Sequence, residues 1–302
     1  MASYLKANEI QKIRVSSNID TFSSKLQVKK CKQDISSINK PYLRIVLGDI
    51  TGEINTNIFP GRLKATFEDV KNDFAIGNVL DIKMSVRRTG DASFLNIEEF
   101  DVLSPEEYDL DEFVEKSELD LDELMNTLNV TIDTIRNPYL KKLLTKIFEN
   151  QELKKMYIEC PSSIKYHHSY RYGNLEHTIG MLNIFKQLVT YYNGKTILDL
   201  DLLYTGIILH DIGKIKEYSL NNRVPFYNED SILGHLYLGS QIVSEYINNV
   251  EDFPKDLETR LIHLILSHHG KEEWGAIVEP QFPEAHVLHL LDMIDSRFKL
   301  NY

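Results

Sequence analysis

Two hydrophobic periodicities divide this chain of 302 residues into a front part and a back part. From about residue 12 to residue 103, apolar and polar residues alternate with the period of two that is typical of half-buried strands. The back part instead repeats its leucines and isoleucines at intervals of three and four, as on one face of a helix, for example at Leu121, Leu124 and Leu128. Because each pattern buries its own core, the sequence predicts a multidomain protein of α and β structure.

The front part contains two pairs of predicted strands, at residues 42–49 with 51–59 and at residues 79–86 with 93–97. Each pair surrounds a turn with a glycine, Gly52 or Gly90, which can adopt the positive φ angle that tight turns need. Short strands joined by hairpins are typical of a small closed β-barrel. We therefore expect an OB-fold over residues 12–103, the barrel of this size that binds oligonucleotides. A small barrel with an ordinary solvated surface is the alternative.

The net charge of −11 is unevenly distributed. Residues 1–97 carry 15 Lys and Arg against 10 Asp and Glu, a net of +5, and the remainder carries 19 against 35, a net of −16. A basic front part can hold a polyanion, although the acidic total argues against a passive nucleic-acid coat. Basic and aromatic residues are mixed in this part, as expected where cations follow a phosphate backbone and bases stack on rings. The candidate substrate-binding residues there are Arg44, Arg62, Arg87, Arg88, Tyr42, Phe59 and Phe94.

An acidic segment separates the two patterns. Residues 98–123 hold 13 acidic residues against a single basic one, Lys116. We interpret residues 104–159 as an acidic helical connector, with an acidic gate that mimics nucleic acid as the alternative.

Cysteine usage and hydropathy exclude several classes of protein. Cys31 and Cys160 match no CxxC spacing, so neither a disulfide framework nor a thiolate zinc site is predicted. No apolar run approaches the roughly 20 residues needed to cross a bilayer, and the first residues lack a secretory signal. A cytoplasmic protein that does not contact membranes is therefore expected.

The back part concentrates the groups that carry chemistry, because all ten histidines lie between His167 and His289. His210 falls on the same helical stripe as Leu203 and Ile207, so its side chain is expected to point toward the core, with Asp211 one step round the helix. A buried histidine and carboxylate are costly when unpaired, and a bound cation would satisfy both. A structural hydrogen-bonded pair is the alternative for this dipeptide alone.

The same arrangement recurs on other predicted helices. His177 lies on the stripe of Met181 and Ile184 and also faces inward. Further candidates at the starts, ends or core faces of helices are His235, His268, His269, Asp292 and Asp295. Imidazole and carboxylate groups from five helices suit two first-row metal ions, Mn, Fe, Co or Zn, better than Ca or Mg. Asp211 is well suited to bridge the two ions.

The order of these residues resembles a known family. His177, His210-Asp211, His235, His268-His269 and Asp292 follow the pattern of the HD superfamily of metal-dependent phosphohydrolases, and residues 210–214 look like its signature. The wider layout is similar to the bacterial 3′-to-5′ exoribonucleases of the YhaM type, with a front OB-fold, the His167-His168 pair and the run Ser267-His268-His269-Gly270. Gly173-Asn174-Leu175 departs from the Gly-Gly-Leu that such proteins often show.

The resemblance implies an all-α HD domain over residues 160–302, with a site for two divalent metal ions. The first ion would be held by His177, His210, Asp211 and Asp292, with Asp295 as an alternative to Asp292, and the second by Asp211, His235 and His268, with His269 as a further ligand. Manganese is the expected metal, with iron, cobalt or zinc as alternatives. Asp211 and Lys214 are the implied catalytic residues, with Lys214 as an electrostatic clamp on the phosphate.

The remaining residues of the back part receive smaller roles. His167 and His168 are assigned to substrate contact or to a supporting position behind the metal ligands, with a structural loop as the alternative. Trp274 is expected to be a packing residue, and the expected bystanders are His263, His286 and His289.

The function that the resemblance implies is a metal-dependent 3′-to-5′ exoribonuclease that shortens single-stranded RNA to nucleoside 5′-monophosphates. Single-stranded DNA is a second candidate substrate, and a homo-oligomer is a candidate assembly. Two alternatives stay open: an HD phosphohydrolase of small nucleotides, and a nucleic-acid-binding adaptor with an inactive HD site.

Overall fold

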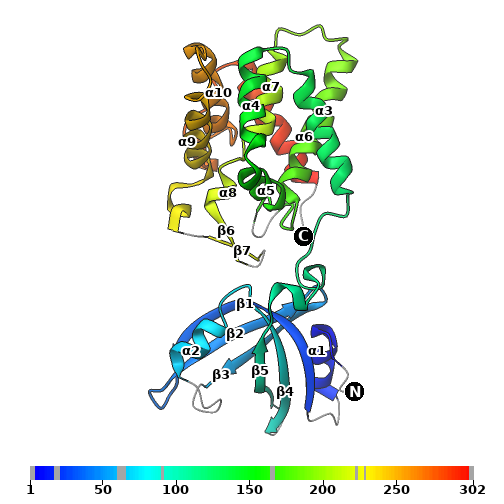
Figure 1. Cartoon of the computed structure of the whole chain (residues 1–302), viewed down its shortest axis with the longest axis vertical. Helices are drawn as coiled ribbons and strands as arrows, with labels where there is room; N and C mark the ends of the chain where they lie inside the picture. The colour runs from blue at the N-terminus through cyan, green and yellow to red at the C-terminus, as the bar shows by residue number, and fades with distance from the viewer. Residues whose placement is uncertain are drawn as a thin grey trace. The chain divides into compact units, whose positions relative to one another are not determined.

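The structure, a computed structural model, describes residues 4–16, 21–59, 66–89, 92–163, 167–221, 224–227 and 229–298. The chain divides after Glu115 into two compact units, each with its own hydrophobic core (Figure 1). In the described part of the chain, none of the helices combines the length and the apolar character that crossing a lipid bilayer needs.

The first unit is built on five antiparallel strands in the order β3-β2-β1-β4-β5. The strands are β1 (Thr21–Ile35), β2 (Pro41–Asp49), β3 (Gly52–Ile58), β4 (Val79–Thr89) and β5 (Ala92–Val102). The long strand β1 pairs with β2 along its second half and with β4 along its first half. The alternation read from the sequence is visible on β2, where Leu43, Ile45 and Leu47 are buried in the core. Helices α1 (Ala7–Ser16) and α2 (Phe67–Asp73) also contribute core residues.

Backbone pairing does not close this sheet into the expected barrel, and the OB-fold is not confirmed. Among the described residues, the edge strands β3 and β5 share no ladder. They approach through a side chain instead, where the Thr56 hydroxyl donates to the Leu95 carbonyl at 2.8 Å. Alternation predicts strands and their buried faces, but closure depends on strand tilt and stagger, which a period of two does not encode.

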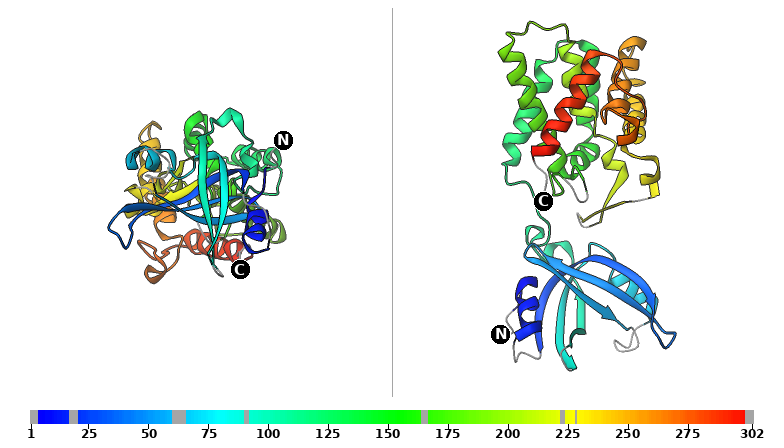
Figure 2. Two further views of the ribbon diagram at one scale, coloured as in Figure 1. Left: turned by 90° about the horizontal axis from the view of Figure 1, so that it is seen from below. Right: turned by 180° about the vertical axis from the view of Figure 1, so that it is seen from behind.

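The second unit is mainly helical (Figure 1). Its α-helices are α3 (Leu121–Thr134), α4 (Pro138–Glu149), α5 (Gln151–Glu159), α6 (Gly173–Tyr191), α7 (Leu200–Leu209), α8 (Lys214–Glu217), α9 (His235–Ile247), α10 (Lys255–Ser267) and α11 (Pro283–Phe298). It also contains short 3-10 turns at Glu229–Leu233 and Glu272–Trp274, whereas those at Pro105–Glu107 and Leu110–Glu112 belong to the first unit. The last helix, α11, packs against α6, α7 and α10, which brings it beside the helices that carry or end at His177, His210 and His268 (Figure 2).

The segment that the sequence analysis interprets as a connector, residues 104–159, does not stand apart from the helical unit. Its helices α3, α4 and α5 contribute Leu128, Leu144 and Tyr157 to the same core as α6 and α7, and all three side chains are fully buried. The Tyr157 hydroxyl donates to the Ile208 carbonyl at 2.8 Å, so α5 is tied to the end of α7. Most of the acidic residues of this segment precede α3, and Asp122, Glu123 and Asp133 on α3 are exposed while the inner face of that helix is apolar.

Two short strands interrupt the otherwise helical unit, which the sequence analysis expects to contain none. Strands β6 (Tyr218–Asn221) and β7 (Val224–Tyr227) pair between α8 and α9. Each is four residues long, too short for a period of two to be distinguished from chance.

Candidate metal centre

His210 and Asp211 lie at the end of α7, where the helix opens into a tight turn. His210 is fully buried, and its Nδ1–H donates to the Ile207 carbonyl at 2.9 Å, which leaves Nε2 aimed into the unit. The turn can sit this deep because Gly213 has no side chain; a Cβ atom there would lie 1.9 Å from the His235 carbonyl oxygen. The start of α9 is thereby held close to the His-Asp turn.

A first group of side chains surrounds His177 on α6, which is fully buried. Its Nε2 lies 3.3 Å from Asp292 Oδ1, and its Nδ1 lies 2.7 Å from Asp295 Oδ2. Burial alone would lower the pKa of His177, but the two aspartates outweigh it and raise that pKa to about 9. His177, His210 and Asp292 each offer an atom within 4.8 Å of the others, which is close enough to hold one ion.

Asp295 occupies a different place from Asp292. It contacts the Nδ1 side of His177, away from the nitrogen that faces Asp292. Its approach depends on Gly180, because a Cβ atom on that residue would lie 2.0 Å from Asp295 Oδ1. In this position Asp295 orients the imidazole of His177, as a carboxylate behind a metal-binding histidine does.

A second group is formed by His235, His268 and His269, which also lie within 4.8 Å of one another. His268 Nδ1 bonds to the Ile265 carbonyl at 2.8 Å, and His235 Nδ1 bonds to Glu217 at 3.1 Å, so both rings are held from behind. Burial is the main cause that lowers the pKa of His268 well below its usual value and the pKa of His269 to about 4. Neutral imidazole is the form that binds metal ions.

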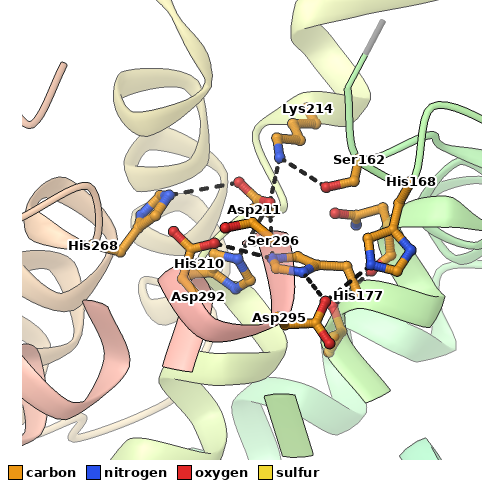
Figure 3. Close-up of polar contacts among 12 residues, drawn as sticks. Ser162, His168, His177, His210, Asp211, Lys214, His268, Asp292, Asp295 and Ser296 are labelled. Atoms are coloured by element: carbon orange, nitrogen blue, oxygen red, sulfur yellow. Dashed lines mark hydrogen bonds and ion pairs between the residues drawn. The ribbon is translucent and has the colours of Figure 1, made fainter. Parts of the chain in front are cut away.

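Asp211 lies between the two groups, with one oxygen toward each (Figure 3). Its Oδ2 is 3.2 Å from His210 Nε2, whereas its Oδ1 is 3.5 Å from His235 Nε2 and 3.6 Å from His268 Nε2. Burial would raise the pKa of Asp211, but the adjacent Lys214 and His210 hold it well below its usual range. The carboxylate is therefore ionised and placed to bridge two ions.

The donor set fits divalent cations. Among the described residues, His177 Nε2, His210 Nε2 and Asp211 Oδ1 are buried without a hydrogen-bond partner of good geometry. Such atoms are costly to bury, and all three point into the same small volume. Nitrogen and carboxylate donors together select first-row transition metals over Ca and Mg.

A cavity of about 430 Å³ opens onto this centre. It is lined by His167, Asp211, Lys214, His268, His269, Trp274, His289, Asp292, Met293, Ser296 and Arg297. Lys214 is almost fully buried; its ammonium pairs with Asp211 and donates to the Ser162 hydroxyl at 3.3 Å. Burial lowers the pKa of His167 to about 3, so this ring is neutral in the cavity wall.

Of the two positions expected for His168, in contact with substrate or behind the ligands, the geometry corresponds to the second. His168 is only 1% exposed, with Nε2 2.9 Å from Asp295 and Nδ1 2.9 Å from the Tyr170 hydroxyl. Conversely, His289 and Trp274 line the cavity, although we expected a bystander and a packing residue.

Of the other two expected bystanders, His263 accepts from the Gln281 amide at 3.2 Å and His286 is exposed, both away from the cavity lining.

Sequence reasoning missed Ser162 and Ser296. Ser296 could have been found one turn after Asp292 on the same helix face, whereas no sequence signal marks Ser162.

Tyr42, Arg44, Arg87 and Phe94 lie on the side of their strands opposite the buried residues, whereas Arg88 follows Arg87 directly and points to the other side of β4. Tyr42 and Phe59 stack with ring centroids 5.1 Å apart, and Arg87 and the exposed Phe94 are cross-strand partners on β4 and β5. Arg44 extends beside Tyr42 but is paired with Asp34 at 2.7 Å. Arg88 is also exposed on β4, and Arg62 lies outside the described residues.

A helical unit that gathers histidines and aspartates in this order defines an HD-domain protein, the class of metal-dependent phosphohydrolases. The HD domain family matches residues 174–297, which contain His177, His210-Asp211, His235, His268-His269 and Asp292.

Comparison with curated proteins narrows the class to one family. The chain is 33% identical to the 3′-5′ exoribonuclease YhaM of Shouchella clausii (strain KSM-K16), over 97% of this chain and 88% of that protein. It is 30% identical to the 3′-5′ exoribonuclease YhaM of Bacillus subtilis (strain 168), over 91% of this chain and 84% of that protein, and 29% identical to that of Bacillus pumilus (strain SAFR-032), over the same shares. The chain belongs to the YhaM family of HD-domain proteins.

Proposed function

We propose that this chain is a metal-dependent exonuclease that removes nucleotides one at a time from the 3′ end of single-stranded RNA and releases nucleoside 5′-monophosphates. Single-stranded DNA is a second candidate substrate. The observation that carries the proposal is the convergence of His177, His210 and Asp211 in a family whose relatives are named 3′-5′ exoribonucleases, with the buried donor atoms of all three left without partners.

Two divalent ions, manganese above all, would occupy the centre. His177, His210, Asp211 and Asp292 are the proposed ligands of one ion, and Asp211, His235, His268 and His269 are those of the other. When bound, such ions supply Lewis acidity that favours deprotonation of the attacking water and offsets charge on the phosphate. The separation of the Asp211 oxygens, one toward each group, supports a bridging role.

The chain's own side chains would hold the phosphodiester against this centre. Lys214 is buried beside Asp211 and is steadied by Ser162, so its ammonium is a preformed positive charge in a site of low dielectric constant. His167 is neutral and lines the same cavity, where it can exchange hydrogen bonds with the substrate without adding charge.

The first unit would grip the RNA upstream of the cleaved end. Its surface presents rings on which bases can stack, the Tyr42–Phe59 pair and Phe94, and Phe94 lies across from the exposed Arg87, which is followed on the same strand by the exposed Arg88. The five-stranded sheet, with β1 shared between β2 and β4, is the arrangement on which we base the proposal of an OB-type module.

The direct test uses single-stranded RNA labelled at either end, incubated with the full chain with and without Mn²⁺. We expect mononucleotides to appear first from the 3′ label, only with metal, while the 5′ label shortens stepwise. Internal fragments, or turnover of free nucleotides in place of RNA, would contradict the proposal and favour a small-nucleotide hydrolase.

Two histidine variants make the test specific to the site. His210→Ala should abolish hydrolysis and reduce bound metal, because it removes a proposed ligand. His263→Ala is the matched control, since this histidine lies in the same unit but outside the cavity lining, and it should retain activity. If His210→Ala degraded RNA at the parent rate, the assignment of the centre would be wrong. If the parent bound RNA without hydrolysing it under any metal, an adaptor with an inactive site would be the better description.

A further inference from the structure

The outer wall of the cavity contains an aromatic pair that the proposed chemistry does not use. Trp274 and His289 both line the cavity that also contains Asp211, Lys214 and Asp292. Their rings lie 5.8 Å apart at an interplanar angle of 27°, an offset stack. Neither ring belongs to the two groups of candidate metal ligands.

His289 is held rigidly in this wall. Its Nδ1–H donates to the His268 carbonyl at 2.8 Å, which ties the ring to the segment that carries the second group of histidines. The ring fits there because Gly270 has no side chain; a Cβ atom would lie 2.4–2.7 Å from three atoms of the imidazole. Gly270 also has a φ angle of +85°, which glycine adopts readily. The His289 ring that stacks with the Trp274 indole is therefore fixed to the segment that carries candidate metal ligands.

Trp274 remains half exposed to solvent although His289 and Lys271 contact its ring system. Its side chain is 51% exposed, while His289 lies on one part of the ring system and the Lys271 ammonium lies 4.8 Å from the ring centroid. Lys271 is itself 53% exposed and can move aside. An aromatic side chain in the wall of a cavity that also contains a few converging charged groups is typical of a small-ligand site.

We infer that Trp274 is the platform on which the base of the 3′-terminal nucleotide stacks. This inference rests on the proposed function, since it places the phosphodiester 5′ to that nucleotide against Lys214 and Asp211. Stacking on an indole face holds every base, because each base has a π face. The platform therefore positions the terminal nucleotide without selecting its sequence, as stepwise shortening of an RNA requires.

The chain offers a direct reporter, because Trp274 is its only tryptophan. With the full chain loaded with Mn²⁺, addition of adenosine 5′-monophosphate should quench the tryptophan fluorescence in a saturable way. Ribose 5-phosphate carries the same phosphate without a base and should compete with the nucleotide without quenching by itself. Equal spectral effects of the two ligands, or saturable binding of the nucleotide without any effect, would overturn the inference. This measurement does not depend on RNA hydrolysis.

Kinetic variants provide the second test. Trp274→Leu removes the aromatic face but keeps apolar bulk, and it should raise KM for single-stranded RNA about tenfold, the size expected for one lost stack. Trp274→Phe should restore most of the parent KM. Tyr191→Leu is the matched control, because Tyr191 is 78% exposed in the same unit and does not line the cavity.

A substrate without a terminal base separates the platform from the proposed function. For RNA that ends in an abasic 3′ nucleotide, the rate of the first cleavage should fall relative to ordinary RNA by about the same factor as Trp274→Leu causes. The Trp274→Leu protein should cleave RNA with an abasic 3′ end and RNA with an ordinary 3′ end at similar rates. If the parent hydrolyses RNA from the 3′ end but treats both ends alike, the platform is refuted and the proposed function stands. If the parent hydrolyses no RNA, the proposed function fails and the fluorescence comparison alone decides whether Trp274 stacks on a nucleotide base.

Discussion

Asp295 lies behind His177, on the side of the imidazole away from Asp292. It bonds to His177 at 2.7 Å and to His168 at 2.9 Å, and His168 in turn contacts Tyr170. The two imidazoles share Asp295 Oδ2 and hold the pKa of this carboxyl at about 2, although burial would raise it. A charged acceptor at this position holds a proton on His177 Nδ1, so Nε2, which faces Asp292, is the nitrogen that a cation would bind in place of a proton.

Gly180 provides a test of this role at the level of one atom. Gly180→Ala places a methyl group where Asp295 Oδ1 now lies, at 2.0 Å, so the carboxylate must leave His177. Although alanine favours a helix over glycine, we expect metal affinity or activity to fall by roughly 10- to 100-fold, the usual effect of losing such a partner. Hydrolysis rates measured over a range of Mn²⁺ concentrations would show the loss most clearly at limiting metal.

A double-mutant comparison isolates the cause. In an Asp295→Ala background the methyl group has nothing to displace, so adding Gly180→Ala should change activity little. Equal losses from Gly180→Ala in both backgrounds would show that the methyl group disturbs helix α6 and not the Asp295–His177 contact.

For the candidate site, the sequence predicts which side chains of a single helix face the core, but not which helices meet there. The stripe that carries His177 and the stripe that carries His210 both indicate inward-facing imidazoles, and both side chains are fully buried. Contacts between helices leave no such trace along the chain. The sequence therefore left open whether His168 contacts substrate and placed His289 among the bystanders, because the bonds to Asp295 and to the His268 carbonyl join segments far apart in sequence.

At the scale of elements, helix α5 shows how the end of the predicted connector, residues 104–159, packs into the helical unit. The carbonyl of Ile208 lies in the last turn of α7, where intrahelical partners run out. The Tyr157 hydroxyl of α5 donates to it at 2.8 Å and also lies 3.1 Å from the Thr178 hydroxyl of α6. One side chain thus joins three helices directly before the His210-Asp211 turn.

Removing this hydroxyl should cost stability without touching the site. Tyr157→Phe leaves the buried Ile208 carbonyl without its donor, which we expect to lower the free energy of unfolding by about 1–3 kcal/mol. Chemical denaturation gives the value, and Tyr191→Phe is the control, because that tyrosine is 78% exposed and should leave stability unchanged. A Tyr157→Phe protein as stable as the parent would mean that the bond contributes nothing to the union of α5 with α7.

Sequence patterns located most elements but not their assembly. On α4, Leu140, Leu143, Leu144 and Ile147 recur at helical spacing and all four are buried. The same pattern could not reveal that α4 shares a core with α7, so a connector was the natural interpretation of the acidic segment. Likewise the alternation on β3 and β5 identified their buried faces, whereas the absence of a ladder between them is a property of the whole sheet.

At the scale of the whole molecule, charge is unevenly distributed along the chain. Residues 1–97 carry a net charge of +5, residues 98–115 add nine acidic residues and no basic one, and the outward face of the first unit brings Arg87 beside the exposed ring of Phe94. The second unit is acidic, and some of its carboxylates, among them Asp211 and Asp292, gather where cations would offset their charge. An RNA would thus be held locally by the exposed arginines of one unit, while the other needs metal ions before it can accept a phosphate.

This division predicts that substrate length decides which arginines matter. Arg87 is exposed on β4 beside Phe94, so Arg87→Ala should weaken binding of long single-stranded RNA and lower the slope of log K against log salt by roughly 0.7, the value for one phosphate contact on a single strand. A dinucleotide needs only the cavity of the second unit, and its KM should not change. Lys195→Ala, an exposed charge of the second unit outside the cavity lining, serves as the control and should leave both substrates unaffected. If Arg87→Ala raised KM for the long RNA and for the dinucleotide by the same factor, Arg87 would not act by binding the longer RNA. The loss of its side chain would then disturb the fold.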